Sequence, residues 1–411
     1  MSNNFRARTK TTNTLIYTFL SLFLSVSGCK SVIDRQDVRP RVLRDVPARV
    51  LAYRLEPDVD SPRQQIEDPG EKLEAIQKDF SSRRTDDALI RTVKSPDGNR
   101  VLALYGTDEE PTSAFRIDLY SSDGQFLRNL SPPTLSCVFP ETVAWSPDNN
   151  LVTFIAHKRA MPSPSPTPPV VIEEPSASPQ PSATIAPTFA PVAAFQTEQI
   201  YVCNRDGYDL KPITSREGLI YFAFAWAPDS HALVALACKE AEWDARERQS
   251  KLPVGRPRLL TPDGQERLLD DGLAEALPVW SPDASKVATA FETDVAIYDA
   301  ATDRPTQARL PMRDQLIAAS VVYEQKVAAK KAQQGSKESS NAAPAGSPSP
   351  VAHAASQGVP ASFNPIVRLE WVAPERLYFQ TAYILVLPNE TISTFPRWHL
   401  LQLSAQAAVL K

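Results

Sequence analysis

The chain has few of the residues that metal centres, nucleotide sites and disulfide frameworks need. Its 411 residues include only four cysteines, four histidines and 13 glycines, and the histidines lack the close spacing of a zinc site. No Gly-x-Ser-x-Gly elbow, phosphate-binding glycine loop or zincin motif is present. The net charge is −4 at pH 7, without a basic block in the body of the chain. We therefore expect no metal, no cofactor, no catalytic residues and no nucleic-acid partner.

Long apolar runs are also scarce, and the one marked run lies at the N-terminus. Three basic residues precede the stretch from Leu15 to Val26, which is too short to cross a hydrocarbon core of about 30 Å. It ends in Val26-Ser27-Gly28-Cys29, a sequence that resembles a lipobox. The resemblance implies that residues 1–28 are a lipoprotein signal peptide and that Cys29 is acylated. The alternative is an ordinary secretory signal with an incidental cysteine.

Three further cysteines follow Cys29, namely Cys137, Cys203 and Cys238. An odd number of thiols in an exported protein allows at most one internal disulfide. Each of the three lies in or beside an apolar run, which favours buried thiols over a bridge.

The body of the chain is built from repeats. Five segments share a short apolar strand, a Pro-Asp turn and a second short strand. Proline presets φ in such a turn, and the aspartate bonds the local backbone. A tryptophan often precedes the turn, where we interpret it as an apolar plug between sheets. The repeated positions are Pro96, Asp97, Trp145, Pro147, Asp148, Trp226, Pro228, Asp229, Trp280, Pro282, Asp283, Trp371 and Pro374.

A second hairpin follows each repeat, in three cases with an Asp-Gly turn, so that each unit predicts four strands. Repeats spaced by about 50 residues, two inserts aside, predict an all-β fold, a β-propeller of five or six four-stranded blades. The motif resembles the Pro-Asp repeats of TolB-type periplasmic propellers, and the resemblance covers residues 88–411. Two departures are clear, since TolB has six blades and carries a separate α/β domain. The resemblance implies a scaffold that assembles with envelope proteins.

Residues 29–87 are expected to form a tether between the membrane and the propeller. Within it, Arg49–Leu55 supplies either a strand of a sixth blade or a strand that closes the ring, and Glu71–Phe80 predicts a short helix. The predicted fifth unit ends in a strand over residues 408–410.

Three segments interrupt the repeats. Residues 161–191 and 334–362 are rich in Pro, Ser and Ala, and we predict that both inserts are disordered. Just before the second insert, residues 314–331 have helix-forming composition, and we favour one or two turns on the rim over a coiled coil. Glu240–Gln249 is highly charged, and we interpret it as a solvated loop in preference to a cation site.

Strand alternation separates the connections of such a propeller onto two faces. The Pro-Asp and Asp-Gly turns lie on one face, and the three long connections lie on the other, which we infer to be the functional face. Two functions fit these observations. One is a protein-protein interaction scaffold, held by lipid on the periplasmic or outer side of the envelope. The other is a propeller enzyme or carbohydrate-binding module that uses the central channel.

The lipid anchor makes a direct prediction. We expect Cys29→Ala to release the protein from the membrane fraction or to leave an uncleaved precursor, because the acylated thiol is lost. Fractionation with labelled fatty acid measures this, and unchanged lipid labelling of the variant would contradict a lipoprotein.

Overall fold

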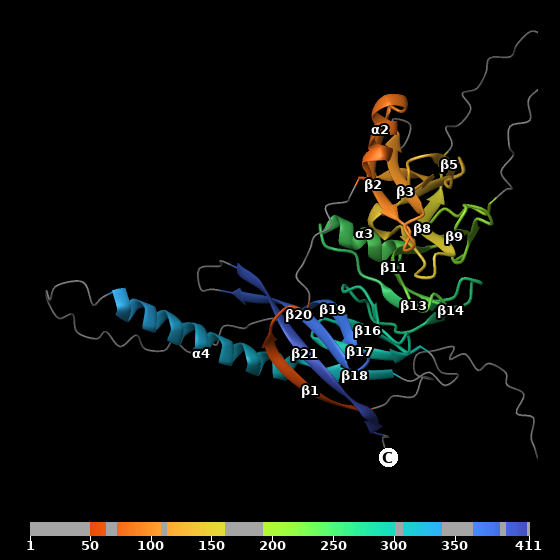
Figure 1. Ribbon diagram of the computed structural model, residues 1–411. Coiled ribbons are helices and arrows are strands. Elements are labelled where there is room, and N and C mark those ends of the chain that lie inside the picture. The colour runs from red at the N-terminus through yellow and green to blue at the C-terminus, as the bar shows by residue number, and fades with distance from the viewer. Residues whose placement is uncertain are drawn as a thin grey trace, which may run out of the picture. The chain divides into compact units, whose positions relative to one another are not determined.

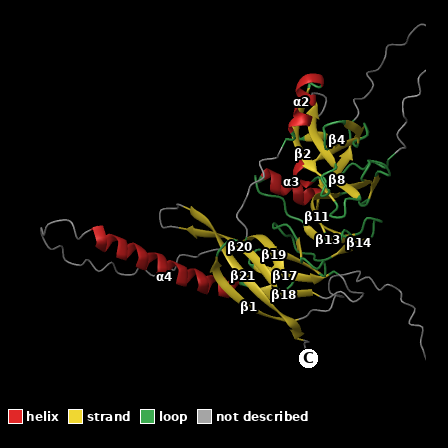
Figure 2. Ribbon diagram, in the orientation of Figure 1, coloured by secondary structure: helices red, strands yellow, loops and turns green. Residues whose placement is uncertain are grey.

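The computed structural model describes residues 50–62, 72–107, 113–160, 192–300, 307–338, 365–386 and 392–408. These residues form antiparallel sheets with a few helices (Figure 1, Figure 2), as the repeats predict. The signal peptide, Cys29, the first insert and residues 339–362 of the second lie outside the described residues.

The first two repeat units form one continuous sheet. Sheet I contains β2 (Asp87–Lys94), β3 (Arg100–Thr107), β4 (Ala114–Ser121) and β5 (Phe126–Asn129). Sheet II contains β7 (Ala144–Trp145), β8 (Leu151–Lys158), β9 (Gln199–Asn204) and β10 (Lys211–Pro212). Strand β6 (Leu135–Val138) pairs with both β4 and β8, and it therefore joins the two sheets into nine strands.

The remaining units form three separate four-stranded sheets. Sheet III contains β11 (Leu219–Trp226), β12 (Leu233–Lys239), β13 (Arg256–Leu260) and β14 (Glu266–Leu268). Sheet IV contains β15 (Val279–Trp280), β16 (Lys286–Phe291), β17 (Asp294–Asp299) and β18 (Gln307–Pro311). Sheet V contains β19 (Ile366–Ala373), β20 (Arg376–Val386), β21 (Ile392–Ala408) and β1 (Val50–Val59).

Sheet V takes its fourth strand from the other end of the described chain. Strand β1 pairs antiparallel with β21, from Val50↔Ala408 to Val59↔Trp398. The segment therefore completes the last sheet, and it does not contribute a strand to a sixth sheet. Of residues 408–410, where the sequence predicts the fourth strand, only Ala408 is among the described residues; it belongs to β21, and β1 occupies the edge beside it.

An ion pair between a buried arginine and an aspartate fixes this closure. The Arg397 guanidinium on β21 donates to both carboxylate oxygens of Asp58 on β1, at 2.7 and 2.9 Å. It also donates to Ser320 Oγ and to the Ala319 carbonyl of helix α4 (Arg313–Glu338). Since only 3% of the Arg397 side chain is exposed, β1, β21 and α4 are joined through one desolvated group.

The repeat tryptophans lie at the ends of the first strands. Trp145 and Trp371 are buried, and Trp226 and Trp280 are partly buried. The Trp145 indole donates to the Val93 carbonyl of sheet I at 3.1 Å, and Trp280 donates to the Ala225 carbonyl of sheet III at 3.0 Å. Trp145 therefore links sheet II to sheet I, and Trp280 links sheet IV to sheet III.

Of the three α-helices in the described residues, two revise the sequence interpretation. Helix α2 (Glu74–Arg83) overlaps the predicted helix. The segment interpreted as a charged loop is helix α3 (Glu240–Arg248), where Glu242 caps the Lys239 backbone N–H at 2.9 Å. Helix α4 has 26 residues, because strong helix formers continue well beyond the expected one or two turns and into the first residues of the predicted insert.

Two further predictions concern burial and the membrane. Cys137, Cys203 and Cys238 are buried free thiols, as the apolar runs around them predict. Within the described residues, no helix is both long enough and apolar enough to span a bilayer.

The Pro-Asp turns share one geometry. Ser95 Oγ donates to Asp97 Oδ1 at 2.6 Å, and the same carboxylate oxygen accepts from the Asn99 backbone N–H at 3.1 Å. Ser146–Asp148 and Ser281–Asp283 repeat this pair. The residue after each aspartate has left-handed φ. These residues are Gly98 (71°), Asn149 (63°), Ser230 (63°) and Ala284 (57°).

The left-handed residue also connects neighbouring turns. The Asp97 backbone N–H donates to Asn149 Oδ1 at 2.9 Å, and the Asp148 backbone N–H donates to Ser230 Oγ at 3.0 Å. Ala284 occupies the equivalent position in sheet IV, and alanine has no side-chain acceptor for the turn of sheet III. The chain of turn-to-turn hydrogen bonds therefore stops between sheets III and IV.

This gap predicts a stabilising substitution. We expect Ala284→Asn to raise the unfolding free energy by about 1 kcal/mol, because asparagine tolerates left-handed φ and supplies the missing acceptor. Ala284→Gly is the matched control, since it relieves the backbone without adding an acceptor. Urea unfolding compares the two, and equal stability of the variants would contradict the turn-to-turn hydrogen bond.

Candidate functional site

The described helices all lie in connections on one side of the sheets, which we call the insert face. Helix α3 joins the second and third strands of sheet III, whereas α4 joins sheet IV to sheet V and α2 joins β1 to sheet I. Strand β6 and the short helix η2 (Pro140–Thr142) join sheet I to sheet II. Because adjacent strands are antiparallel, all these connections leave the ends opposite the Pro-Asp turns, whose side we call the turn face.

Sheet V extends this face with a two-stranded ribbon. The last pair between β19 and β20 on this side is Ile366↔Thr381, and the last pair between β1 and β21 is Val59↔Trp398. Pairing between β20 and β21 continues to Val386↔Ile392. The ribbon therefore runs beyond both outer neighbours (Figure 1).

Helix α3 is held firmly against its sheet. The Trp243 ring lies 5.7 Å from Phe139 and 5.6 Å from Phe222, measured between ring centroids. The Glu242 carboxylate accepts two hydrogen bonds from Arg256, at 2.7 and 2.8 Å, and these bonds lower the pKa of Glu242. The helix is thus a fixed part of the insert face, contrary to the solvated loop that its charge indicates.

Three exposed leucines lie in the connections before β13 and after β14, and we call Leu252, Leu273 and Leu277 the leucine patch. Their exposed fractions are 74%, 39% and 56%. Arg246 connects the two segments that carry them, since it donates to the Leu252 carbonyl at 2.7 Å and to Glu275 at 2.5 Å. Exposed apolar side chains that gather on one surface are typical of protein contact sites.

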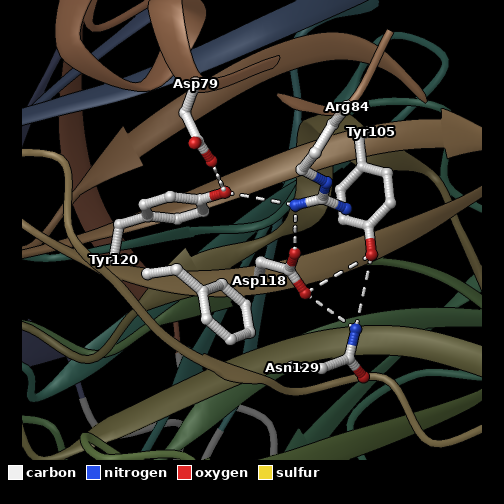
Figure 3. A pocket seen from close by; sticks show the side chains of 7 residues that line it. Asp79, Arg84, Tyr105, Asp118, Tyr120 and Asn129 are labelled. Atoms are coloured by element: carbon white, nitrogen blue, oxygen red, sulfur yellow. Dashed lines mark hydrogen bonds and ion pairs between the residues drawn. The ribbon is translucent and has the colours of Figure 1, made fainter. Parts of the chain in front are cut away.

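A separate polar pocket lies beneath α2. Ile76 and Phe80 of the helix are buried against an apolar face of sheet I. Beside them is an open cavity of about 350 Å³ (Figure 3). Its lining residues are Asp79, Arg84, Tyr105, Asp118, Tyr120, Phe126 and Asn129.

Arg84 is the centre of the pocket's hydrogen-bond network. One guanidinium nitrogen contacts Asp118 Oδ2 at 2.5 Å and donates to Tyr120 OH at 3.1 Å, and another part of the group binds Asp87 at 2.8 Å. The guanidinium also lies over two adjacent rings, 4.3 Å from the centre of Phe80 and 4.1 Å from that of Tyr105.

The carboxylates of the pocket accept from neighbouring side chains. Asn129 Nδ2 donates to Asp118 Oδ1 at 2.7 Å, and Tyr120 OH donates to Asp79 Oδ2 at 3.0 Å. Asp118 is 97% buried as a side chain and belongs to the middle of β4. The pocket therefore contains a desolvated ion pair with an ordered polar shell.

Burial shapes the titration of these groups. It raises the pKa of Asp118, against the opposing charge of Arg84 and the hydrogen bonds from Arg84 and Asn129. The pKa of Arg84 is raised as well, because Asp118 outweighs the desolvation that would lower it. Burial also raises the pKa of Tyr105 and of Tyr120 to about 12, so both phenols carry their protons at neutral pH.

The repeat residues singled out by sequence lie elsewhere. The prolines and aspartates of the Pro-Asp turns lie on the turn face, and none of the sequence-predicted positions lines the pocket. Sequence reasoning missed Arg84 and Asp118. The signal was available in β4, where Phe115, Ile117 and Leu119 alternate with Arg116, Asp118 and Tyr120. In a stack of sheets, both faces of a strand normally pack against apolar neighbours. A strand with charged residues on its second face therefore indicates that something other than a sheet covers that face.

The described residues contain no group of three or more His, Cys, Asp or Glu side chains that could hold a metal ion.

Loss of Arg84 should destabilise the fold. We expect Arg84→Ala to cost about 3 kcal/mol at neutral pH, because Asp118 is left buried without its counter-ion. Arg83→Ala is the matched control, since 82% of its side chain is exposed and its loss should cost at most about 1 kcal/mol. Chemical unfolding measures both. Equal effects of the two substitutions would contradict the importance of the ion pair.

The comparisons show likeness of fold at a low level. No family model and no curated protein matches the chain. Prolyl oligopeptidase B from Galerina marginata gives a TM-score of 0.39 at 9% identity, covering 77% of this chain and 36% of that one. Dipeptidyl peptidase 4 from Porphyromonas gingivalis gives 0.35 at 9% identity, with 74% and 46% covered. A functionally unknown protein from Desulfotomaculum acetoxidans gives 0.32 at 7% identity, with 75% and 69% covered. This chain thus spans about a third of prolyl oligopeptidase B, and these likenesses assign it no activity.

Proposed function

We propose that the chain is a cell-envelope lipoprotein whose TolB-like β-propeller is a protein-protein interaction scaffold without catalytic activity. In this proposal the five sheets are five blades, and β1 is the strand that closes the last one. The observation that carries the proposal is the division of the molecule into two unlike faces. Helices and the long ribbon lie on the insert face, and tight turns form the turn face.

The direction of β1 supports this arrangement. Val50 pairs with Ala408, at the end of β21 that lies on the turn face, so β1 enters from the turn face and runs towards the insert face. Cys29 is 21 positions ahead of Val50. A chain of that length reaches at most about 70 Å when extended. A lipid at Cys29 would therefore be connected to the sheets at the turn face, where β1 begins.

The leucine patch gives the insert face a contact surface. Leu252 and Leu277 are more than half exposed, and the Gly255↔Ala274 bridge holds their two segments together. A rigid apolar patch beside charged residues of α3 is suited to a folded envelope protein with a matching apolar surface. Because the patch is held by backbone hydrogen bonds, binding would require little ordering of the scaffold.

Cross-linking in intact cells tests the proposal. A photo-cross-linking amino acid is placed at Leu252 or Leu277, and the control position is His231 on the turn face, whose side chain is 87% exposed. We expect adducts with the same envelope protein from both leucine positions and none from His231. The identity of the partner is then checked by the reverse experiment, in which the cross-linking amino acid is placed on the partner.

A charge substitution provides the second measurement. Leu277→Asp should reduce the adduct at Leu252 at least tenfold while the melting temperature holds, because the carboxylate would be desolvated by the partner. Equal labelling at His231 and Leu252, or an adduct that survives Leu277→Asp, would contradict a scaffold that works through the insert face.

A further inference from the structure

The pocket beneath α2 has an aromatic wall that the fold leaves open to solvent. Phe126 on β5 is 50% exposed, although it packs edge-on against the buried Tyr120 with ring centroids 5.7 Å apart. Its contact with Tyr120 therefore uses only part of the ring. Figure 3 shows Asp118 with Tyr120 on one side and Tyr105 and Asn129 on the other.

The charges of the pocket decide which ligands it can hold. Its lining contains two carboxylates, Asp79 and Asp118, and one guanidinium, Arg84. An anion would face both carboxylates, while the guanidinium is already bound to Asp118 and Asp87. A second cation would lie close to Arg84, which already occupies the faces of Phe80 and Tyr105. Like charges in a partly desolvated site repel strongly, so the pocket suits a neutral ligand.

The polar atoms of the pocket require a ligand that both donates and accepts. The Asp79 carboxylate has lone pairs beyond the one that Tyr120 uses, whereas Asp118 is buried and accepts from Arg84, Asn129 and Tyr105. The side-chain amide oxygen of Asn129 accepts from no side chain of the described residues. In Figure 3 this oxygen points away from Asp118. Hydroxyl groups meet this need, since each one donates once and accepts twice.

We propose that this pocket binds a neutral saccharide of one or two rings, whose apolar face stacks on Phe126 and whose hydroxyl groups bond Asp79 and Asn129. The volume of about 350 Å³ is at the small end of ligand pockets and matches a ligand of this size. Arg84 and Tyr120 position the carboxylates and do not need to touch the sugar. The site is on the outer strands of sheet I and is independent of the leucine patch.

Saccharide binding to the full mature chain tests the proposal. Saturation-transfer NMR is run with a panel of common hexoses, N-acetylhexosamines, pentoses and their disaccharides, each at 10 mM. Choline and arginine methyl ester are the cationic probes, and inorganic phosphate is the anionic one. We expect saturation transfer to at least one saccharide and none to the charged probes.

Two matched variants then locate the site. Phe126→Ala should weaken saccharide binding at least tenfold with an unchanged melting temperature, because the exposed ring contributes a stacking face and little core. Tyr208→Ala is the control, since Tyr208 is 52% exposed and lies outside the pocket. We expect it to leave binding unchanged.

Three results would overturn the proposal. The first is the absence of transfer to every saccharide, and the second is binding of the cationic or anionic probes alone. The third is equal saccharide binding by the Phe126→Ala and Tyr208→Ala variants.

Discussion

The antiparallel pairing of β1 with β21 is the constraint on which the rest of the structure depends. It joins residues more than 300 positions apart, and Arg397 reinforces it by binding Asp58 and helix α4 from a buried position. Without β1, sheet V would present β21 as a long unpaired edge, which is a template for aggregation. The same pairing sets the direction in which the N-terminal segment approaches the sheets. The closure of the last sheet and the orientation of the proposed tether therefore have one cause.

Strand alternation then separates scaffold from working surface. Each Pro-Asp turn is short because proline and a hydrogen-bonded aspartate reverse the chain within four residues, and this leaves little room for insertions on the turn face. Connections on the opposite ends have no such constraint. Helices α2, α3 and α4 lie there, together with the ribbon of β20 and β21. The insert face, whose connections are free to differ in length, thus also carries the exposed apolar side chains that could bind a partner.

In sheet I, one face packs against sheet II and the other is covered by helix α2. In sheets II, III and IV, apolar residues on the two faces pack against neighbouring sheets, whereas Asp118 and Tyr120 of β4 face helix α2 and its flanking Arg84. A helix covers less area than a sheet, so part of the face remains accessible as the polar cavity. The buried ion pair stabilises little by itself, but it would fix the position of α2, because displacing Arg84 would leave Asp118 buried without its counter-ion.

The sequence by itself determined the all-β fold, the repeat unit, the position of the Pro-Asp turns and the burial of three free thiols. These features depend on local turn chemistry and on a period of two along each strand, which are readable in short windows. Only the tertiary structure decided that β1 completes sheet V, that Glu240–Arg248 is a helix packed through Trp243, and that Arg84 meets Asp118. Each of these depends on contacts between residues more than 20 positions apart. A charged segment such as α3 contains no local sign of the aromatic surface that will hold it, because that surface is assembled from other parts of the chain.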